Sequence, residues 1–126
     1  MRVLFIEDDV MNRRVVRDML QLAGAEMCEA VDAPSGLEMV DSDNFDIILM
    51  DLRMPGMDGM TAVGRIRARS DAKASIPIIV VTADTALDIR ERCVSGGADS
   101  VILKPVAMRE LFDAMGRTMM KARARH

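Results

Sequence analysis

The sequence predicts an α/β domain in which five strand–helix units form an open parallel sheet. Its apolar runs are continuous rather than alternating, which is typical of strands covered on both faces. A segment with helical spacing follows each run, and crossovers of that length join parallel strands in right-handed units. The chain has 126 residues, about the size of one domain and enough to bury a core of its own. We therefore expect one doubly wound domain over residues 1–126.

The first two units are predicted from short apolar runs that alternate with amphipathic segments. Residues 3–6 are too few for a helix and rich in strand formers, so they are the first strand. Apolar residues spaced four apart predict a helix over 11–23. The second strand is predicted at 27–31, and a short helix at 35–40, with Pro34 close to its start.

The other three units follow the same alternation. Strands are predicted at 47–50, 76–81 and 100–103, and helices at 57–69, 86–95 and 108–119. The helix at 86–95 has few apolar positions and ends at two glycines, which are common helix stops. The basic stretch KARARH, residues 121–126, is expected to be a C-terminal tail.

Composition excludes several classes of protein. Half of the residues are hydrophobic and 29% are charged, which argues against disorder. A net charge of −3 gives no general attraction to nucleic acid or to anionic membranes. No apolar run approaches the roughly eighteen residues of a membrane span, and the start, MRVLFIEDD, is too short and too acidic for a signal peptide. We therefore expect a cytoplasmic protein whose two cysteines, Cys28 and Cys93, are reduced.

Polar side chains follow four of the five predicted strands, at the point where each strand ends. They are Glu7, Asp8 and Asp9 after the first strand, Asp51 after the third, Thr82 after the fourth and Lys104 after the fifth. In an open parallel sheet, ligands bind beyond the carboxyl ends of the strands. Each residue alone has an ordinary explanation, as Asp9 has in capping the next helix. Together they predict one site at one edge of the sheet.

The clustered acids predict a bound cation. Two carboxylates about 4 Å apart repel by about 4 kcal/mol at an effective dielectric near 20, so a proton or a cation must sit among them. A few all-oxygen ligands suit Mg²⁺, which keeps its waters and leaves room for a phosphate. Lys104 and Thr82 would then offer a counter-charge and a hydrogen-bond donor to phosphoryl oxygens. Asp51, on a rigid strand end, is placed to act as a nucleophile toward phosphorus.

Four motifs in this order, FIEDD, ILMDLRMPGMDG, VVTAD and GADSVILKP, cover nearly the whole chain. With them the chain resembles the receiver domains of two-component response regulators. The resemblance implies a flavodoxin-like fold with strand order 2-1-3-4-5. It also implies the role of each site residue: Asp51 as phosphoacceptor, Asp8 as direct and Glu7 as water-mediated Mg²⁺ ligand, the backbone carbonyl of Arg53 as a further ligand, and Thr82 and Lys104 as partners of the phosphoryl group. A cis peptide bond between Lys104 and Pro105 is implied as well.

The resemblance also sets expectations for activity and partners. A receiver is not an enzyme beyond its own phosphorylation and dephosphorylation, and its phosphodonor is the phosphohistidine of a sensor histidine kinase or a histidine phosphotransfer protein. The stretch DDVMNRRVV, with Asn12, looks like receivers attached to hybrid kinases. The chain is nevertheless expected to be free-standing, as a monomer or a phosphorylation-dependent dimer. Its output would be the docking of an unknown target protein on the surface formed by residues 86–120, because a weakly apolar helix is suited to switching.

Three features are particular to this chain. Val101 stands where many receivers have Tyr or Phe, so the usual aromatic swing, coupled to Thr82, cannot occur as such. Arg53 and Asp84 flank the site, and we expect them to pair across its entrance and hinder the attacking water. The alternative is that they are two solvated charges worth at most about 1 kcal/mol. A candidate kinase-docking patch, or else a solvated helix face, is formed by Arg13, Arg14 and Arg17.

Other classes of protein fit less well. An NAD-binding domain would need a glycine-rich loop where EDD stands, and acids there would repel a pyrophosphate. A metal-dependent phosphatase shares the strand-end Asp nucleophile, but it would need a second acid and a cap domain for which the chain has no room. The alternative that stays open is a receiver-like binding module that acts without phosphorylation. It predicts the same fold with a degraded acid site, whereas every site residue is intact here.

Overall fold

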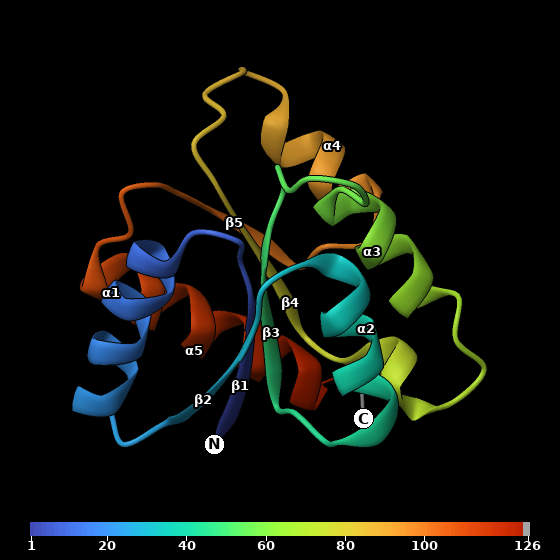
Figure 1. Ribbon diagram of the computed structural model, residues 1–126, viewed down its shortest axis with the longest axis horizontal. Helices are drawn as coiled ribbons and strands as arrows, with labels where there is room; N and C mark the ends of the chain where they lie inside the picture. The colour runs from blue at the N-terminus through green and yellow to red at the C-terminus, as the bar shows by residue number, and fades with distance from the viewer. Residues whose placement is uncertain (125–126) are drawn as a thin grey trace.

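The computed structural model describes residues 1–124 and contains the alternation of strands and helices that the sequence predicts (Figure 1). The strands in this part of the chain are β1 (Arg2–Ile6), β2 (Glu26–Ala30), β3 (Ile47–Asp51), β4 (Ile78–Thr82) and β5 (Ser100–Leu103). Its helices are α1 (Val10–Leu22), α2 (Ala33–Ser42), α3 (Gly59–Arg67), α4 (Ile89–Ser95), α5 (Met108–Ala124) and the short 3-10 helix η1 (Ala72–Ser75).

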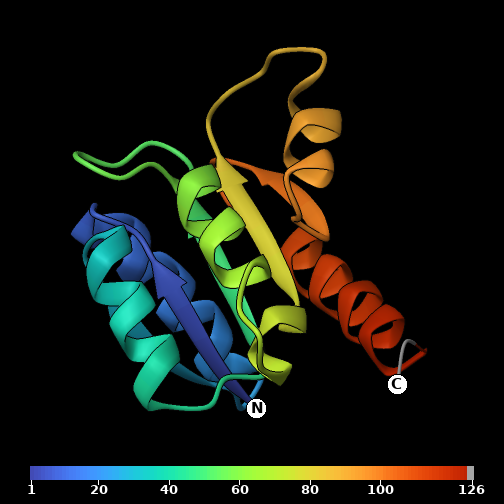
Figure 2. The same cartoon turned by 90° about the vertical axis from the view of Figure 1, so that its right-hand side faces the viewer.

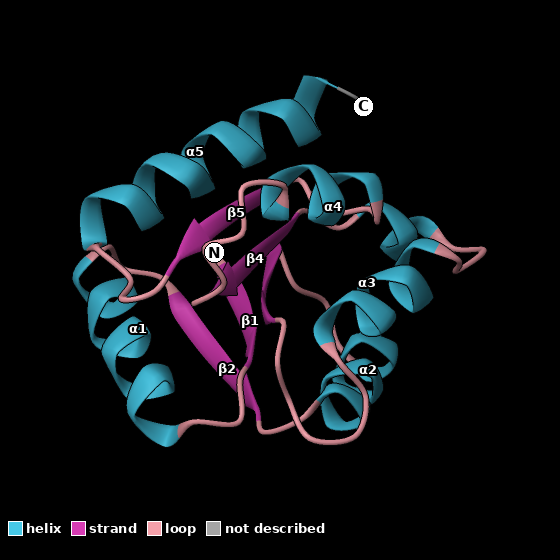
Figure 3. Ribbon diagram, turned by 90° about the horizontal axis from the view of Figure 1, so that it is seen from above, coloured by secondary structure: helices cyan, strands magenta, loops and turns pink. Residues whose placement is uncertain are grey.

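The strands form one parallel sheet in the order β2-β1-β3-β4-β5, which confirms the predicted fold class and strand order. Helices α1 and α5 cover one face of this sheet, and α2, α3 and α4 cover the other (Figure 3). The chain crosses from one face to the other at the middle of the sheet. Such a switch in winding opens a crevice at the carboxyl ends of the central strands.

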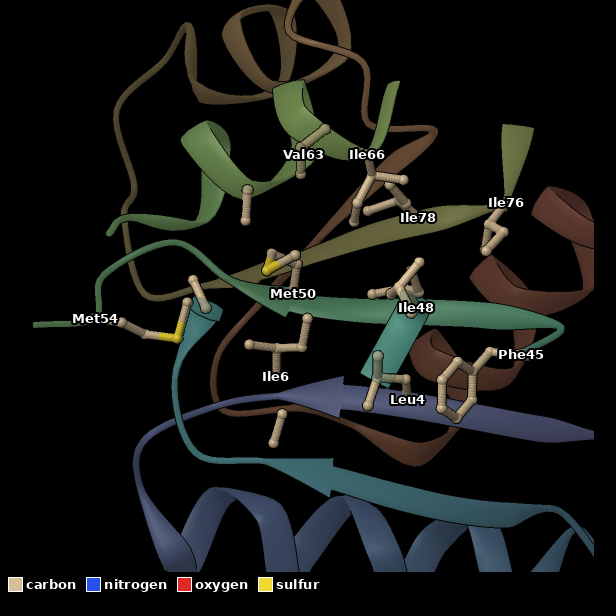
Figure 4. Packing of buried hydrophobic residues seen from close by; sticks show 14 residues of the cluster. Leu4, Ile6, Phe45, Ile48, Met50, Met54, Val63, Ile66, Ile76 and Ile78 are labelled. Atoms are coloured by element: carbon tan, nitrogen blue, oxygen red, sulfur yellow. The ribbon is translucent and has the colours of Figure 1, made fainter. Parts of the chain in front are cut away.

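Both faces of the sheet are buried, which explains why the strands are continuously apolar. Successive side chains of a strand point to opposite faces. In β1, Leu4 and Ile6 lie in the core under α2 and α3, while Val3 and Phe5 lie in the core under α1 and α5. Figure 4 shows the first of these cores, where side chains of β1, β3 and β4 meet Ile66 of α3. The four side chains of β1 named above and Ile66 are each at most 1% exposed.

Most element boundaries lie within two residues of the prediction, and three of the differences have a clear physical reason. β4 begins at Ile78 rather than at 76, because the chain before it forms η1 and Pro77 has no N–H to donate to the sheet. α4 begins at Ile89, so residues 86–88, predicted to be helical, belong to the loop that follows β4. α5 continues to Ala124, so most of the predicted tail is the last helical turn, where basic residues complement the helix dipole. Residues 125–126 of that tail lie outside the described part of the chain.

The carboxyl ends of the strands meet at one edge, where long connections rise above the sheet (Figure 2). After β3, the chain turns sharply at Gly56, whose φ of 82° is a left-handed conformation that glycine adopts without strain. After β4, the connection to α4 arches away from the sheet (Figure 2). In residues 1–124, no helix is both long enough and apolar enough to cross a membrane.

Candidate functional site

The six strand-end residues that the sequence assigns to one site do meet in one cavity. It has a volume of about 210 Å³ and lies at the carboxyl edge of the central strands. Its walls are formed by Glu7, Asp8, Asp9, Asn12, Asp51, Arg53, Thr82, Ala83 and Lys104. The structure therefore brings together every residue that was predicted for phosphoryl or metal binding.

Hydrogen bonds within the sheet hold the site residues in place. Asp51 is the last residue of β3 and lies in register with Val81 of β4. Thr82 ends β4, and its backbone carbonyl accepts a hydrogen bond from the N–H of Lys104 at 2.8 Å. Because neighbouring parallel strands end together, side chains from β3, β4 and the residue after β5 lie beside one another.

The acidic cluster has the geometry of a metal site. Glu7, Asp8 and Asp51 each offer a carboxylate oxygen, and these oxygens lie within 4.8 Å of one another. The Glu7 side chain is fully buried and Asp51 is 4% exposed, whereas Asp8 is exposed. Neither carboxylate oxygen of Glu7 accepts a well-directed hydrogen bond from the described residues. Lys104 faces Glu7 Oε1 at 2.7 Å, which leaves Glu7 Oε2 without a partner among the described residues. A buried oxygen without a partner is costly, and an oxygen-liganded divalent cation would remove that cost. The cluster therefore fits Mg²⁺.

Lys104 compensates part of the negative charge. Its Nζ lies 2.7 Å from Glu7 Oε1 and 3.2 Å from Asp51 Oδ1. Burial, followed by the contact with Asp51, raises the pKa of Glu7, although Lys104 pulls it down. Burial by itself would lower the pKa of Lys104, but its contacts with the two carboxylates outweigh burial and raise it. One ammonium among three carboxylates leaves net negative charge at the site.

Thr82 and Asp84 form the wall of the cavity on the β4 side. Thr82 is 1% exposed, and its Oγ1 accepts a hydrogen bond from the N–H of Asp84 at 3.1 Å. The hydroxyl proton of Thr82 is thereby left for an acceptor in the cavity. Asp84 in turn accepts from the N–H of Ala86 at 2.9 Å, and this bond, more than the nearby Arg53, holds the pKa of Asp84 below its usual value.

The predicted pairing of Arg53 with Asp84 is present. Arg53 Nη2 lies 3.4 Å from Asp84 Oδ2, and Arg92 of α4 approaches the same carboxylate oxygen at 4.0 Å. The Arg53 side chain is 82% exposed, so the pair is open to solvent and weak. Its consequence for water attack stays a prediction. The peptide bond between Lys104 and Pro105 is cis, as the resemblance implies.

The suggestion that Arg13, Arg14 and Arg17 form a docking patch is only partly consistent with the structure. Arg13 and Arg17 both form ion pairs with Glu29 of β2. Arg13 also donates to the backbone carbonyl of Glu7 at 2.7 Å, a contact that nothing in the sequence indicates, because it depends on how α1 packs on β1 and β2. Arg14 is the one arginine of the three that is exposed and makes no ion pair within the described residues.

Gly59 is a further residue of the site that sequence reasoning missed. It begins α3 and packs against the backbone of Asp51 so closely that a Cβ atom would overlap the Asp51 carbonyl oxygen. Its N–H donates to the carbonyl of Leu52 at 2.8 Å. The glycine of the DG pair in PGMDG was the available signal, since a glycine beside a site often marks close backbone approach.

With this geometry established, comparison with known proteins identifies the class. Residues 3–116 match the family described as the response regulator receiver domain. The chain belongs to this family. Its strand order, acidic cluster and strand-end Asp, Thr and Lys are those that the resemblance implied.

The chain is similar to parts of longer proteins. The chain is 38% identical over 106 residues to a cyclic di-GMP phosphodiesterase of Thermotoga maritima, covering 84% of this chain and 27% of that protein. It is 34% identical over 108 residues to the sensor histidine kinase RcsC of Escherichia coli K12, covering 86% and 11%. The chain thus spans about a quarter or less of these two relatives, and the match concerns their receiver portion.

Solved structures agree in fold. The receiver domain of the sensor histidine kinase PA1611 of Pseudomonas aeruginosa PAO1, described with a magnesium ion coordinated in its active site cleft, is 30% identical. It superimposes with a TM-score of 0.84 over 94% of this chain and 96% of that one. A putative response regulator from Chloroflexus aurantiacus J-10-fl, at 24% identity, superimposes with a TM-score of 0.89 over 94% of this chain and 97% of that chain, which supports the fold alone.

Proposed function

We propose that this receiver accepts a phosphoryl group on Asp51, with Mg²⁺, from the phosphohistidine of a sensor histidine kinase or a histidine phosphotransfer protein. The observation that carries the proposal is the arrangement around Asp51. A nearly buried carboxylate at a strand end has two further carboxylates within 4.8 Å and an ammonium at 3.2 Å. Such a site can hold a cation and a phosphate together. The cation compensates the negative charge of the carboxylates, and the phosphate compensates the positive charge of the cation and of the ammonium.

The transfer step uses one oxygen of Asp51. This oxygen attacks phosphorus, a P–O bond forms, and the P–N bond to the donor imidazole breaks, with its electron pair leaving on the nitrogen. Bound Mg²⁺ would neutralise charge on the phosphoryl oxygens. The cation would be held by Asp51, by Asp8, by Glu7 through water and by the backbone carbonyl of Arg53. Lys104, freed from the carboxylates that a cation would then compensate, pairs with a phosphoryl oxygen, and the Thr82 hydroxyl donates to another.

Return to the resting state uses water at the same phosphorus atom. Water attacks phosphorus, the P–O bond to Asp51 breaks with its electron pair on the carboxylate, and the protons of the water pass to phosphate and solvent, which leaves inorganic phosphate and the free carboxylate. This is the only catalysis that we assign to the chain, so it is a signalling domain rather than an enzyme acting on a separate substrate. Arg53 and Asp84, paired beside the entrance, are placed to slow this attack.

The switch is a rearrangement of the surface that follows Thr82. The N–H of Asp84 is bonded to the Thr82 hydroxyl, so movement of Thr82 toward a phosphoryl group pulls on the loop that leads into α4. α4 has seven residues, and Asp88 at its start makes no side-chain capping bond. Little free energy is needed to displace a short, poorly capped helix. With Val101 in place of an aromatic residue, this loop is the route to the docking surface of residues 86–120.

The partners and setting follow from the same reasoning. The phosphodonor is a sensor histidine kinase or a histidine phosphotransfer protein, the downstream target is a protein, and neither nucleic acid nor membrane is needed for the reaction. The chain would work in the cytoplasm, where its donor's phosphohistidine is accessible. A binding module that acts without phosphorylation would have no use for a complete acid cluster with Lys104 and Thr82 beside it, which favours the phosphoacceptor.

The proposal is tested with a small-molecule phosphodonor. The protein is incubated with acetyl phosphate and Mg²⁺, and its intact mass is recorded for the wild type and for Asp51→Asn, each with and without EDTA. We expect one phosphoryl adduct that is labile in base, requires Mg²⁺ and occurs on the wild type alone. An adduct of equal yield on Asp51→Asn, or none on a wild type shown to bind Mg²⁺, would overturn the proposal.

A further inference from the structure

Arg13, in the first turn of α1, reaches back over the loop that carries the proposed metal ligands. Its Nη1 donates to the backbone carbonyl of Glu7 at 2.7 Å, and its Nε donates to Glu29 Oε1 at 3.2 Å. The side chain is only 12% exposed. Arg13 thus links a helix, a strand and the acidic loop. It is not a solvated surface charge.

This contact completes the restraint of the Glu7 backbone. The N–H of Glu7 donates to the carbonyl of Ala30 on β2 at 3.0 Å, and its carbonyl is held by Arg13. That carbonyl belongs to the planar peptide unit that joins Glu7 to Asp8. Its direction therefore sets the direction in which the chain continues to Asp8.

The chain is fixed on the other side of Asp8 as well. The carboxylate of Asp9 accepts hydrogen bonds from the N–H groups of Met11 at 2.8 Å and Asn12 at 3.2 Å, which caps α1. Asp8 lies between these two fixed neighbours. It is exposed, and its own carboxylate is paired with none of the described residues. The restraints on its neighbours, rather than contacts of its own, aim it at the cluster.

We propose that Arg13 is a positioning residue that sets the orientation in which Asp8 meets Mg²⁺. The inference rests on the proposed function, because it takes the acidic cluster to be a Mg²⁺ site. A purely electrostatic role predicts the opposite effect of removing Arg13, since loss of a cation near three carboxylates favours binding of another cation. The sign of the change in Mg²⁺ affinity therefore separates positioning from charge.

The chain provides a matched control for this test. Arg17 also forms an ion pair with Glu29, but in the described part of the chain no hydrogen bond or ion pair joins it to Glu7. Arg17→Ala therefore removes one positive charge and one partner of Glu29, as Arg13→Ala does, and leaves the Glu7 carbonyl held. Arg13→Lys keeps a charge and a donor long enough to reach that carbonyl, so it should restore part of the effect.

Mg²⁺ affinity is measured by isothermal titration calorimetry on metal-free protein, for the wild type and these three variants. We expect Arg13→Ala to weaken Mg²⁺ binding about tenfold, at the low end of what loss of an outer-sphere partner costs a metal site. Arg17→Ala should bind as the wild type does. In metal-free protein, amide hydrogen exchange at Asp8 and Asp9 should accelerate in Arg13→Ala alone.

The outcomes separate this inference from the proposed function. Unchanged or tighter Mg²⁺ binding by Arg13→Ala overturns the inference while the wild type still binds Mg²⁺. Equal weakening in Arg17→Ala also overturns it, because the effect would then belong to Glu29, the partner that both arginines share. A wild type that binds no Mg²⁺ overturns the proposed function itself. If Arg13→Ala does not fold, Arg13→Met keeps most of the buried volume without a donor and carries the same expectation.

Discussion

Neutralising Glu7 should stabilise the metal-free protein, although Glu7 is one of its most buried residues. The substitution is Glu7→Gln, which keeps the shape of the side chain and removes one of three clustered charges. The oxygens of Glu7 and Asp51 lie within 4.8 Å of each other, so their charges repel by about 3.5 kcal/mol or more at an effective dielectric near 20. Burial raises the pKa of Glu7, which means that the folded metal-free protein disfavours its charged form.

The gain is smaller than the repulsion because the substitution also removes an attraction. Lys104 loses its contact with Glu7 at 2.7 Å but keeps Asp51 at 3.2 Å. Replacing a whole buried ion pair by apolar residues is often neutral or stabilising by about 1–4 kcal/mol, whereas removing one partner is costly when it leaves the other charge unpaired. Here Lys104 stays paired with Asp51, so that cost does not arise in full. We therefore expect Glu7→Gln to be more stable than the wild type by about 1–2 kcal/mol without metal. Excess Mg²⁺ should stabilise the wild type more than the variant, because a ligand stabilises the state that it binds.

The assay is urea unfolding near neutral pH, in EDTA and then in excess Mg²⁺. Glu38→Gln is the control, since Glu38 is exposed on α2 and the same chemical change there should alter stability by no more than about 0.5 kcal/mol. A Glu7→Gln variant that is less stable than the wild type in EDTA would refute the reasoning. It would mean that the ion pair with Lys104 outweighs both repulsion and burial.

Three further predictions test other parts of the structure. Gly59→Ala should destabilise the protein by about 1–3 kcal/mol and slow its phosphorylation, because the added Cβ displaces the backbone of the proposed phosphoacceptor. Urea unfolding and phosphorylation by acetyl phosphate measure the two effects. The control in both assays is Gly64→Ala, which lies in the same helix with open space around it. Arg53→Ala should shorten the phosphoryl lifetime, by no more than about fivefold if its ion pair is worth about 1 kcal/mol, and an unchanged decay rate rules out the water-shielding role. Arg2 lowers the pKa of Asp43 from 3.8 to about 2, so this carboxylate stabilises the fold above its unfolded pKa and the contribution is lost as the pH falls toward 2. Unfolding midpoints measured from pH 5 to pH 2 should therefore fall more steeply in the wild type than in Asp43→Asn.

The sheet and its site were predictable because they depend on rules that act along the chain. Strands buried on both faces are apolar at every position, as Val3 and Leu4 show on opposite faces of β1. Once the strands are parallel, the residues after them share one edge, so Asp51 and Thr82 could be placed together without knowing the side-chain contacts. The strand order did not follow from periodicity and required the resemblance to a family.

What could not be predicted depends on contacts between distant segments. Residues 86–88 looked helical because Leu87 suits a helix face, yet Leu87 is fully exposed, and the carboxylate of Asp84 accepts a hydrogen bond from the N–H of Ala86. Arg13 looked like a surface charge because its partner, Glu29, is on β2, and only the packing of α1 on that strand brings them together. Neither contact can be inferred from the residues that lie next to it in the sequence.

The central claim is that Asp51 itself carries the phosphoryl group, and chemical trapping tests this most directly. Protein phosphorylated with acetyl phosphate and Mg²⁺ is reduced with borohydride, which converts an aspartyl phosphate to homoserine, and the peptides are sequenced by mass spectrometry. The account predicts homoserine at position 51 and at no other carboxylate, with none formed in EDTA. Homoserine at position 8, or a trapped residue elsewhere with position 51 unchanged, would contradict it.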